Sequence, residues 1–275
     1  MVNKIMKNAK NMVKKSELYD IDFEKYKKIY GEDFNPSISR KCEMANLWTK
    51  QGLSDDAVAA GHFLGGLKSF NRISEILFEL GLGLENVTSM LDFASGFGRT
   101  NRFFVQAMGA EKITMSDITE EGVEFQKRTF GVKGFLSYKM PEDIKHDKTY
   151  QVVIANSLFS HFNHEFWPIW LEKLYSFVED GGYLIFSTHG YSFFKKRDEE
   201  IRKKMILSSP EHGFYFLPAN ETLGRLEKDY YGTTYVIPKW VQDVVEKHKL
   251  GKIVKSYNPY HGFMSGQDVY VIQKV

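Results

Sequence analysis

The sequence has 275 residues, of which 43% are hydrophobic and 26% are charged, the composition of a globular chain that buries a core. The 37 Lys and Arg against 35 Asp and Glu leave a formal net charge of +2, which argues against an obligate nucleic-acid binder held by backbone charge. The single cysteine, Cys42, excludes an intramolecular disulfide framework and a cysteine-cluster zinc site.

The first fifteen residues, MVNKIMKNAKNMVKK, are basic and rich in Met but lack the continuous apolar segment of a secretory signal. A solvated helix is the preferred interpretation, and an amphipathic helix on a membrane or partner surface is the alternative. No stretch of the sequence approaches the roughly 20 apolar residues that span a bilayer. We therefore expect a cytoplasmic protein without stable membrane insertion, whose oligomeric state the sequence leaves open.

Residues 1–85 contain helical patterns and no convincing strand. Asp22 and Ser54 are predicted N-caps, and Ser69 is predicted to begin a further helix, FNRISEILFELG, that ends on a glycine. The pattern predicts a helical N-terminal extension over 1–85 that acts as a cap on a domain over 86–275.

From Val87 onward, short apolar runs alternate with helical stretches, which predicts βαβ units and a parallel sheet covered by helices on both faces. The predicted helices begin near Arg99, Thr119 and Glu165. The predicted strands of this region are 87–93, 112–117, 134–138, 150–156 and 182–188.

Residues 191–237 interrupt this alternation. A charged helix and then an aromatic, irregular stretch are predicted there, which together are too long for a simple connection and indicate a lid-like insertion. A helix beginning PKWVQDVV and strands over 252–257 and 268–275 follow.

A glycine loop follows the first predicted strand. Gly96 and Gly98 permit a tight turn and a close approach of a ligand to the backbone, and the following helix N-terminus presents N–H groups. A dinucleotide site would have a third glycine where Asn101 stands. The acids Asp92 and Asp117 end two predicted strands, where they would repel phosphates but attract the aminocarboxypropyl group and ribose hydroxyls of S-adenosylmethionine.

The segments DFASGFGR (92–99), MSDI (115–118), VVIANSLFSHF (152–162) and DGGYLIFSTHG (180–190) resemble four ordered motifs of the class I S-adenosylmethionine-dependent methyltransferases. The resemblance covers about residues 87–190. It implies an α/β fold with a Rossmann-like, seven-stranded, mostly parallel sheet whose last strand is antiparallel. The C-terminal region also resembles, loosely, a branch of the family whose members accompany glycan-modifying enzymes.

This resemblance assigns roles to particular positions. The family's first motif glycine is Ala94 here, and the acids at the ends of the first two strands would hold the methionine moiety and the ribose. Side chains after the second and third strands would pack on the adenine, and two residues after the fourth would lie beneath the reactive methyl. The expected cofactor-binding residues are Asp92, Ala94, Ser95, Gly96, Gly98, Arg99, Asp117, Ile118, Met140, Asn156 and Ser157. No metal is expected, because metal-requiring relatives place an aspartate where this chain has Asn156.

Methyl transfer to a hydroxyl requires a proton acceptor, and open α/β sheets bind ligands at the carboxyl ends of their strands. His161 follows the fourth predicted strand and His189 the fifth, and His261 lies in the loop before the last. His189 is the preferred base, while a helix cap or a carbonyl contact is the structural alternative for His161.

These features together predict an S-adenosylmethionine-dependent O-methyltransferase acting on a small molecule or saccharide. A protein or RNA acceptor, or a non-catalytic cofactor-binding subunit, are the alternatives.

Overall fold

The protein is described by a computed structural model that covers residues 14–195, 199–200, 202–203, 213–218, 226–258 and 266–275. The basic N-terminal residues 1–13 and the candidate base His261 lie outside these described residues. Seven strands form one sheet in the order β3-β2-β1-β4-β5-β9-β8, and two further strands, β6 and β7, form a second sheet. This α/β fold confirms the predicted sheet, including its antiparallel last strand β9.

The chain packs as two compact units. The first comprises Met1–Thr88 and Ser95–Ser137, and the second comprises Ser89–Ala94 and Tyr138–Val275. The prediction of a cap over 1–85 and a catalytic domain over 86–275 stays a prediction.

The first unit contains the N-terminal helices, the glycine loop and two strands. Strands β2 and β3 pair in parallel, with Asp117 opposite Leu136, and α6 packs on both. Helix α2 is capped by the Asp22 side chain, as predicted. The helices and strands of this unit are α2 (Phe23–Tyr30), α3 (Glu43–Thr49), α4 (Asp55–Glu79), α5 (Asn101–Met108), β2 (Ile113–Asp117), α6 (Glu120–Phe130) and β3 (Lys133–Leu136).

Helix α4 is one continuous helix where the sequence predicted two. Ser54 caps its N-terminus, as expected, but Ser69 is a buried residue inside the helix, so the prediction that a helix begins there is wrong. Gly65 and Gly66 do not break the helix, because Gly66 is the point at which α4 packs on the backbone of Arg99. The helix ends before Gly81, whose φ of 78° is favourable for glycine.

The N-terminal segment is joined to α5 and α6 inside this unit. The buried Arg102 guanidinium donates hydrogen bonds to the carbonyls of Asn35 (3.0 Å) and Ser37 (3.1 Å). The Asn35 side chain donates to the carbonyl of Thr129 at the end of α6 (2.9 Å). Burial lowers the pKa of Arg102 to about 9. The connection between α2 and α3 therefore helps to hold α5, the helix that follows the glycine loop.

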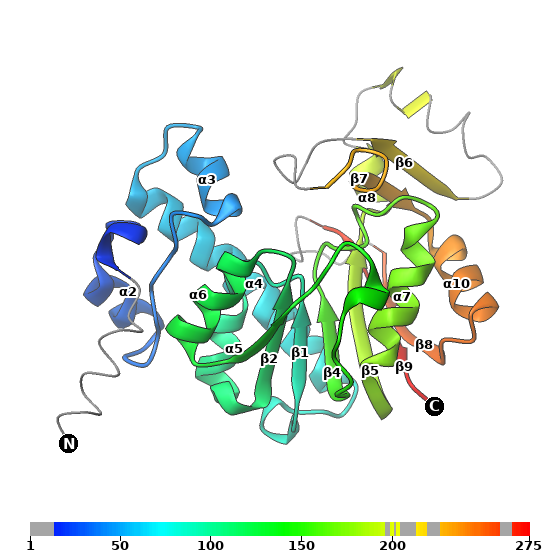
Figure 1. The fold of residues 1–275 in the computed structure, drawn as a ribbon, viewed down its shortest axis with the longest axis horizontal. Coiled ribbons are helices and arrows are strands. Elements are labelled where there is room, and N and C mark those ends of the chain that lie inside the picture. Colours follow the sequence, from blue (N-terminus) through cyan, green and yellow to red (C-terminus); the bar gives the residue numbers. More distant parts are fainter. Residues whose placement is uncertain (1–13, 196–198, 201, 204–212, 219–225, 259–265) are drawn as a thin grey trace. The chain divides into compact units, whose positions relative to one another are not determined.

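The second unit contains most of the sheet. Strands β1, β4 and β5 are parallel, and β9 lies antiparallel between β5 and β8. Helix α7 packs on β5 and α10 on β8 (Figure 1). Trp167 and Trp170 of α7 are buried and belong to the core of this unit. The elements of this unit are β1 (Met90–Phe93), β4 (Tyr150–Ala155), α7 (Phe166–Ser176), β5 (Val178–Thr188), α8 (Tyr191–Lys195), β6 (Phe214–Pro218), β7 (Gly232–Val236), α10 (Pro238–Lys247), β8 (Lys252–Tyr257) and β9 (Asp268–Gln273).

The insertion contains regular structure where the sequence predicted an irregular stretch. Its strands β6 and β7 pair antiparallel, with Phe214 opposite Val236. Strand β6 (FYFLP) is mostly aromatic and β7 (GTTYV) is mostly β-branched and aromatic, residue types that are common in strands, and the pairing between the two shows that they are strands. Strand β7 is also bound to the loops that follow β4 and β5, since its amides at Thr234 and Val236 donate to the carbonyls of Ser160 (2.7 Å) and His189 (3.0 Å).

Candidate functional site

The glycine loop in the first unit is a tight turn between β1 and α5. Gly96 and Gly98 have φ values of 57° and 71°, a region that glycine enters without steric cost. The loop is fixed at its start, where the amide of Ser95 donates to the carbonyl of Ser116 on β2 (3.1 Å). Gly96 and Gly98 of the predicted loop therefore adopt the positive φ values that glycine permits.

Asp117, at the end of β2, organises this loop. Its carboxylate accepts hydrogen bonds from the amide of Gly96 (2.7 Å) and from the amide and hydroxyl of Thr119 (2.9 and 2.7 Å). A carboxylate offers about four lone-pair positions, so these bonds occupy three of them. A ribose that kept both its hydroxyls on Asp117, as predicted, would have to replace one of these bonds.

Helix α6 supports the loop through residues that the sequence did not single out. Buried Gln126 donates from its amide nitrogen to the Ser95 hydroxyl (2.7 Å) and the Gly96 carbonyl (2.9 Å). A Cβ on Gly122 would lie 2.6 Å from the same carbonyl, so only glycine permits this approach of the helix. Gln126 lies on a helix remote in sequence from the loop, and no local pattern marks it.

The remaining predicted cofactor residues of the first unit are Arg99, half-buried at the end of the loop, and Ile118, which is 38% exposed. An exposed isoleucine directly after the strand-end Asp117 is available for apolar contact.

In the second unit, Asp92 is buried in β1, and Ala94 follows it with a φ of 57°. Alanine in this left-handed region is strained by about 1–2 kcal/mol relative to its ordinary conformation. Ala94, the position that the resemblance matches to the family's first motif glycine, thus has a backbone conformation that favours glycine.

Another non-glycine residue with a left-handed backbone conformation follows β4. Ser157 has a φ of 60° and is held there by hydrogen bonds: its amide donates to the Ser187 hydroxyl (2.8 Å), and its hydroxyl accepts from Gln267 (2.7 Å). The Ser187 hydroxyl donates to Gln267 in turn (2.7 Å). Predicted Asn156 and Met140, from the same unit, are half-buried.

His161 contacts a backbone carbonyl, which is the structural role expected for this residue as the alternative to catalysis. Its Nδ1 lies 2.8 Å from the carbonyl oxygen of Gly232 on β7, and its ring stacks on Tyr231 at 4.7 Å. A carbonyl only accepts, so Nδ1 carries the proton and, in the neutral ring, Nε2 carries the lone pair. His161 lies in a turn, and the following helix begins at Phe166, next to the predicted start at Glu165, so His161 is not a cap of that helix.

His189, directly after β5, lies close to His161. Their ring centroids are 6.2 Å apart, and the His189 ring stacks on Phe193 of α8 at 4.2 Å and lies 5.5 Å from Tyr235 of β7. The structure thus brings two of the three predicted base candidates together, on the loops after β4 and β5. The third, His261, is outside the described residues.

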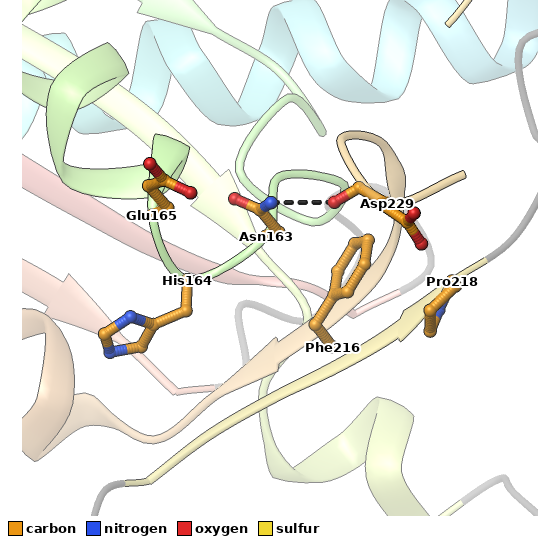
Figure 2. Close-up of a pocket in the computed structure, with 6 residues that line it drawn as sticks. All are labelled: Asn163, His164, Glu165, Phe216, Pro218 and Asp229. Carbon is orange, nitrogen blue, oxygen red and sulfur yellow. Dashed lines mark hydrogen bonds between the residues drawn. The ribbon is translucent and has the colours of Figure 1, made fainter. Parts of the chain in front are cut away.

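A pocket of about 330 Å³ lies elsewhere in the second unit, between the loop after β4 and the β6 strand. Figure 2 shows the Asn163 side chain directed at Asp229, whose carbonyl accepts its hydrogen bond at 2.7 Å. The residues that line the pocket are Asn163, His164, Glu165, Phe216, Pro218 and Asp229. None of the predicted site residues lines this pocket.

Within the described ranges, no group of three or more His, Cys, Asp or Glu side chains is placed to hold a metal ion. No helix in the same part of the chain is both long and apolar enough to span a bilayer.

Comparison with known proteins identifies a family. The sequence model of a methyltransferase domain matches residues 67–230, more than half of the chain. No curated protein matches the chain in sequence.

The fold is similar to solved structures at low identity. One is magnesium protoporphyrin IX methyltransferase from Synechocystis with bound S-adenosylhomocysteine (TM-score 0.50, 15% identity, 76% of this chain and 84% of that one). Another is the 1,6-didemethyltoxoflavin N1-methyltransferase of Burkholderia thailandensis with bound 1,6-didemethyltoxoflavin and S-adenosylhomocysteine (TM-score 0.51, 14% identity, 75% of this chain and 78% of that one).

Proposed function

The chain belongs to the methyltransferase-domain family, and from this membership we propose that it transfers the methyl group of S-adenosylmethionine to a hydroxyl oxygen of a small molecule or saccharide. The coarser part of this statement, an S-adenosylmethionine-dependent methyltransferase, follows from the family itself. The oxygen acceptor is supported by one observation, the pair of histidines after β4 and β5.

The residues of the glycine loop fit the cofactor. Its Gly96 amide is already bound to a strand-end carboxylate, and that carboxylate, Asp117, retains a lone-pair position for a hydroxyl donor. We assign ribose recognition to Asp117, adenine contact to Ile118 and Met140, and the methionine moiety to Asp92 and the 95–98 backbone. When bound, S-adenosylmethionine supplies a methyl group on a positively charged sulfur.

Because that methyl group is already activated, the protein must orient the acceptor and take up its proton. We assign the proton acceptor to His189, with His161 as its alternative. The Gly232 carbonyl holds the Nδ1 proton of His161, which orients that ring and sets its tautomer. The aromatic side chains beside the two rings, Tyr231 and Tyr235, come from the insertion 191–237, which supports its role in lining the acceptor site.

The test is a screen for release of S-adenosylhomocysteine from S-adenosylmethionine with glycosides, phenols and primary amines, together with a peptide mixture and an RNA. Turnover with a glycoside or phenol is expected. Turnover only with amines, peptides or RNA would refute the hydroxyl acceptor, and failure to bind S-adenosylhomocysteine in a calorimetric titration would refute the cofactor assignment. Deuterium exchange with cofactor and acceptor should show protection of the insertion.

A further inference from the structure

Asp268 is the first residue of β9 and lies at the edge of the sheet where ligands bind. It pairs with Thr188, the last residue of the parallel strand β5. Because β9 runs antiparallel to β5, its first residue lies beside the carboxyl end of β5. Open α/β sheets bind their ligands at that edge.

The Asp268 side chain lies in a buried place. The residue is 2% exposed, and its neighbour on the same face of β9, Tyr270, has a buried hydroxyl that lacks a hydrogen-bond partner within the described part of the chain. Desolvation raises the pKa of Asp268 to about 7. Buried polar groups are nearly always hydrogen-bonded, and their exceptions concentrate at functional sites.

The surroundings reserve space for this carboxylate and fix its position. Gly190 lies directly against it, and a Cβ there would clash with all three carboxyl atoms. The preceding residue, Gln267, is held by Ser187 and Ser157 through hydrogen bonds of 2.7 Å each. Asp268 therefore lies beside the end of β5, since its pairing partner Thr188 is the residue before His189.

We propose that Asp268 binds the methyl acceptor by accepting a hydrogen bond from one of its hydroxyl groups. This inference rests on the proposed transfer to a small molecule or saccharide. A hydroxyl satisfies the carboxylate without bringing a second charge into a buried place, which a cationic group would do. The proposed role is recognition, so the chain should prefer acceptors that carry a hydroxyl beside the one that is methylated.

The experiment compares the wild-type protein with Asp268→Ala and Asp268→Asn. Asp180→Ala is the matched control, because the Asp180 side chain is 93% exposed in the same strand pair and bears only a 3.9 Å ion pair to Lys274. Each protein is assayed at about pH 8.5, above the pKa of Asp268, with the glycoside or phenol that wild type turns over fastest and with its analogue lacking the neighbouring hydroxyl. Calorimetry with S-adenosylhomocysteine and thermal unfolding are measured alongside.

The expected result is a KM for the acceptor raised about ten- to a hundredfold in Asp268→Ala, the effect of a lost charge-assisted hydrogen bond. The kcat and the S-adenosylhomocysteine affinity should stay within about threefold, and the variant should no longer distinguish the acceptor from its analogue. Asp268→Asn should show a smaller effect of the same kind, and it decides the question if Asp268→Ala does not fold.

An unchanged KM in both variants, or a fall in kcat at constant KM, would overturn the recognition role while leaving methyl transfer intact. Absence of turnover by wild type with every compound would instead refute the proposed function, and this inference with it.

Discussion

Because α4 packs against the end of the glycine loop, we predict that an alanine will have different effects at two neighbouring glycines of α4, Gly65 and Gly66. A Cβ on Gly66 would lie 2.9 Å from the carbonyl carbon of Arg99, closer still to its oxygen, and 3.0 Å from the Phe103 ring. A Cβ on Gly65 would lie 3.4 Å from the nearest atom, the flexible end of the Arg99 side chain. The Gly65→Ala variant is therefore a control that shares the helix and the substitution but not the clash.

The expected difference in the free energy of unfolding between the two variants follows from two opposing effects. Either substitution stabilises the helix by about 0.8–1 kcal/mol, because alanine loses less backbone entropy than glycine. The clash at Gly66 costs about 1–3 kcal/mol, as overpacking in a dense interior generally does. Gly66→Ala should therefore be about 1–3 kcal/mol less stable than Gly65→Ala.

The clash at Gly66 should also weaken cofactor binding. Relief of the contact requires the Arg99 backbone, at the end of the glycine loop, to move away from α4. A displacement of about 1 Å in an active site can lower the reaction rate about a hundredfold, because the bound groups leave their productive geometry. We expect Gly66→Ala to bind S-adenosylhomocysteine at least about tenfold more weakly, and Gly65→Ala to bind it as wild type does.

The assay is calorimetric titration of the three proteins with S-adenosylhomocysteine, paired with denaturant unfolding of each. The two readouts separate a change of loop position from a loss of stability, because all titrations are made where every protein is folded. Equal affinity in Gly66→Ala and Gly65→Ala would refute the idea that α4 positions the loop.

Four further outcomes are expected. Asp117→Ala should weaken S-adenosylhomocysteine binding about ten- to a hundredfold in calorimetry, because it removes both the proposed ribose contact and the bond that holds the Gly96 amide; unchanged affinity would contradict that role. Ala94→Gly should raise the free energy of unfolding by up to about 1 kcal/mol, since relief of a φ of 57° exceeds the entropy that glycine adds to the unfolded chain, and a clear loss in chemical denaturation would argue against strain there. His189→Gln should lower kcat about 10²–10⁴-fold at unchanged S-adenosylhomocysteine affinity, and turnover within about threefold of wild type would move the role to His161 or His261. The pKa of Asp268 in the folded chain, about 7, lies above its ordinary value of 3.8, so the folded chain binds more protons than the unfolded chain between these pH values. The free energy of unfolding should therefore fall by at most about 4 kcal/mol as the pH rises through that window. Asp268→Asn should remove this fall, and parallel stability–pH curves for the two proteins would contradict it.

The sequence by itself determined the fold class and the location of the glycine loop. Strands β4 and β5 contain the apolar runs VVIA and YLIF, whose consecutive apolar residues indicate strands covered on both faces. The glycines at 96 and 98 adopt positive φ values, and the acid Asp117 ends a strand beside them in the fold. Such features depend on local periodicity, local backbone preference and chain order, so they can be read without knowledge of distant contacts.

Tertiary structure decided the features that depend on distant partners. Helix α4 continues through Gly66 because that glycine packs on Arg99, and the strand character of β6 emerges only through its pairing with β7. Gln126 supports the glycine loop from another helix, and Asp268 is buried by the elements that surround it. Local propensity differs by only about 1 kcal/mol per residue, less than the packing and hydrogen bonding supplied by residues far away in sequence, and those contacts therefore decide.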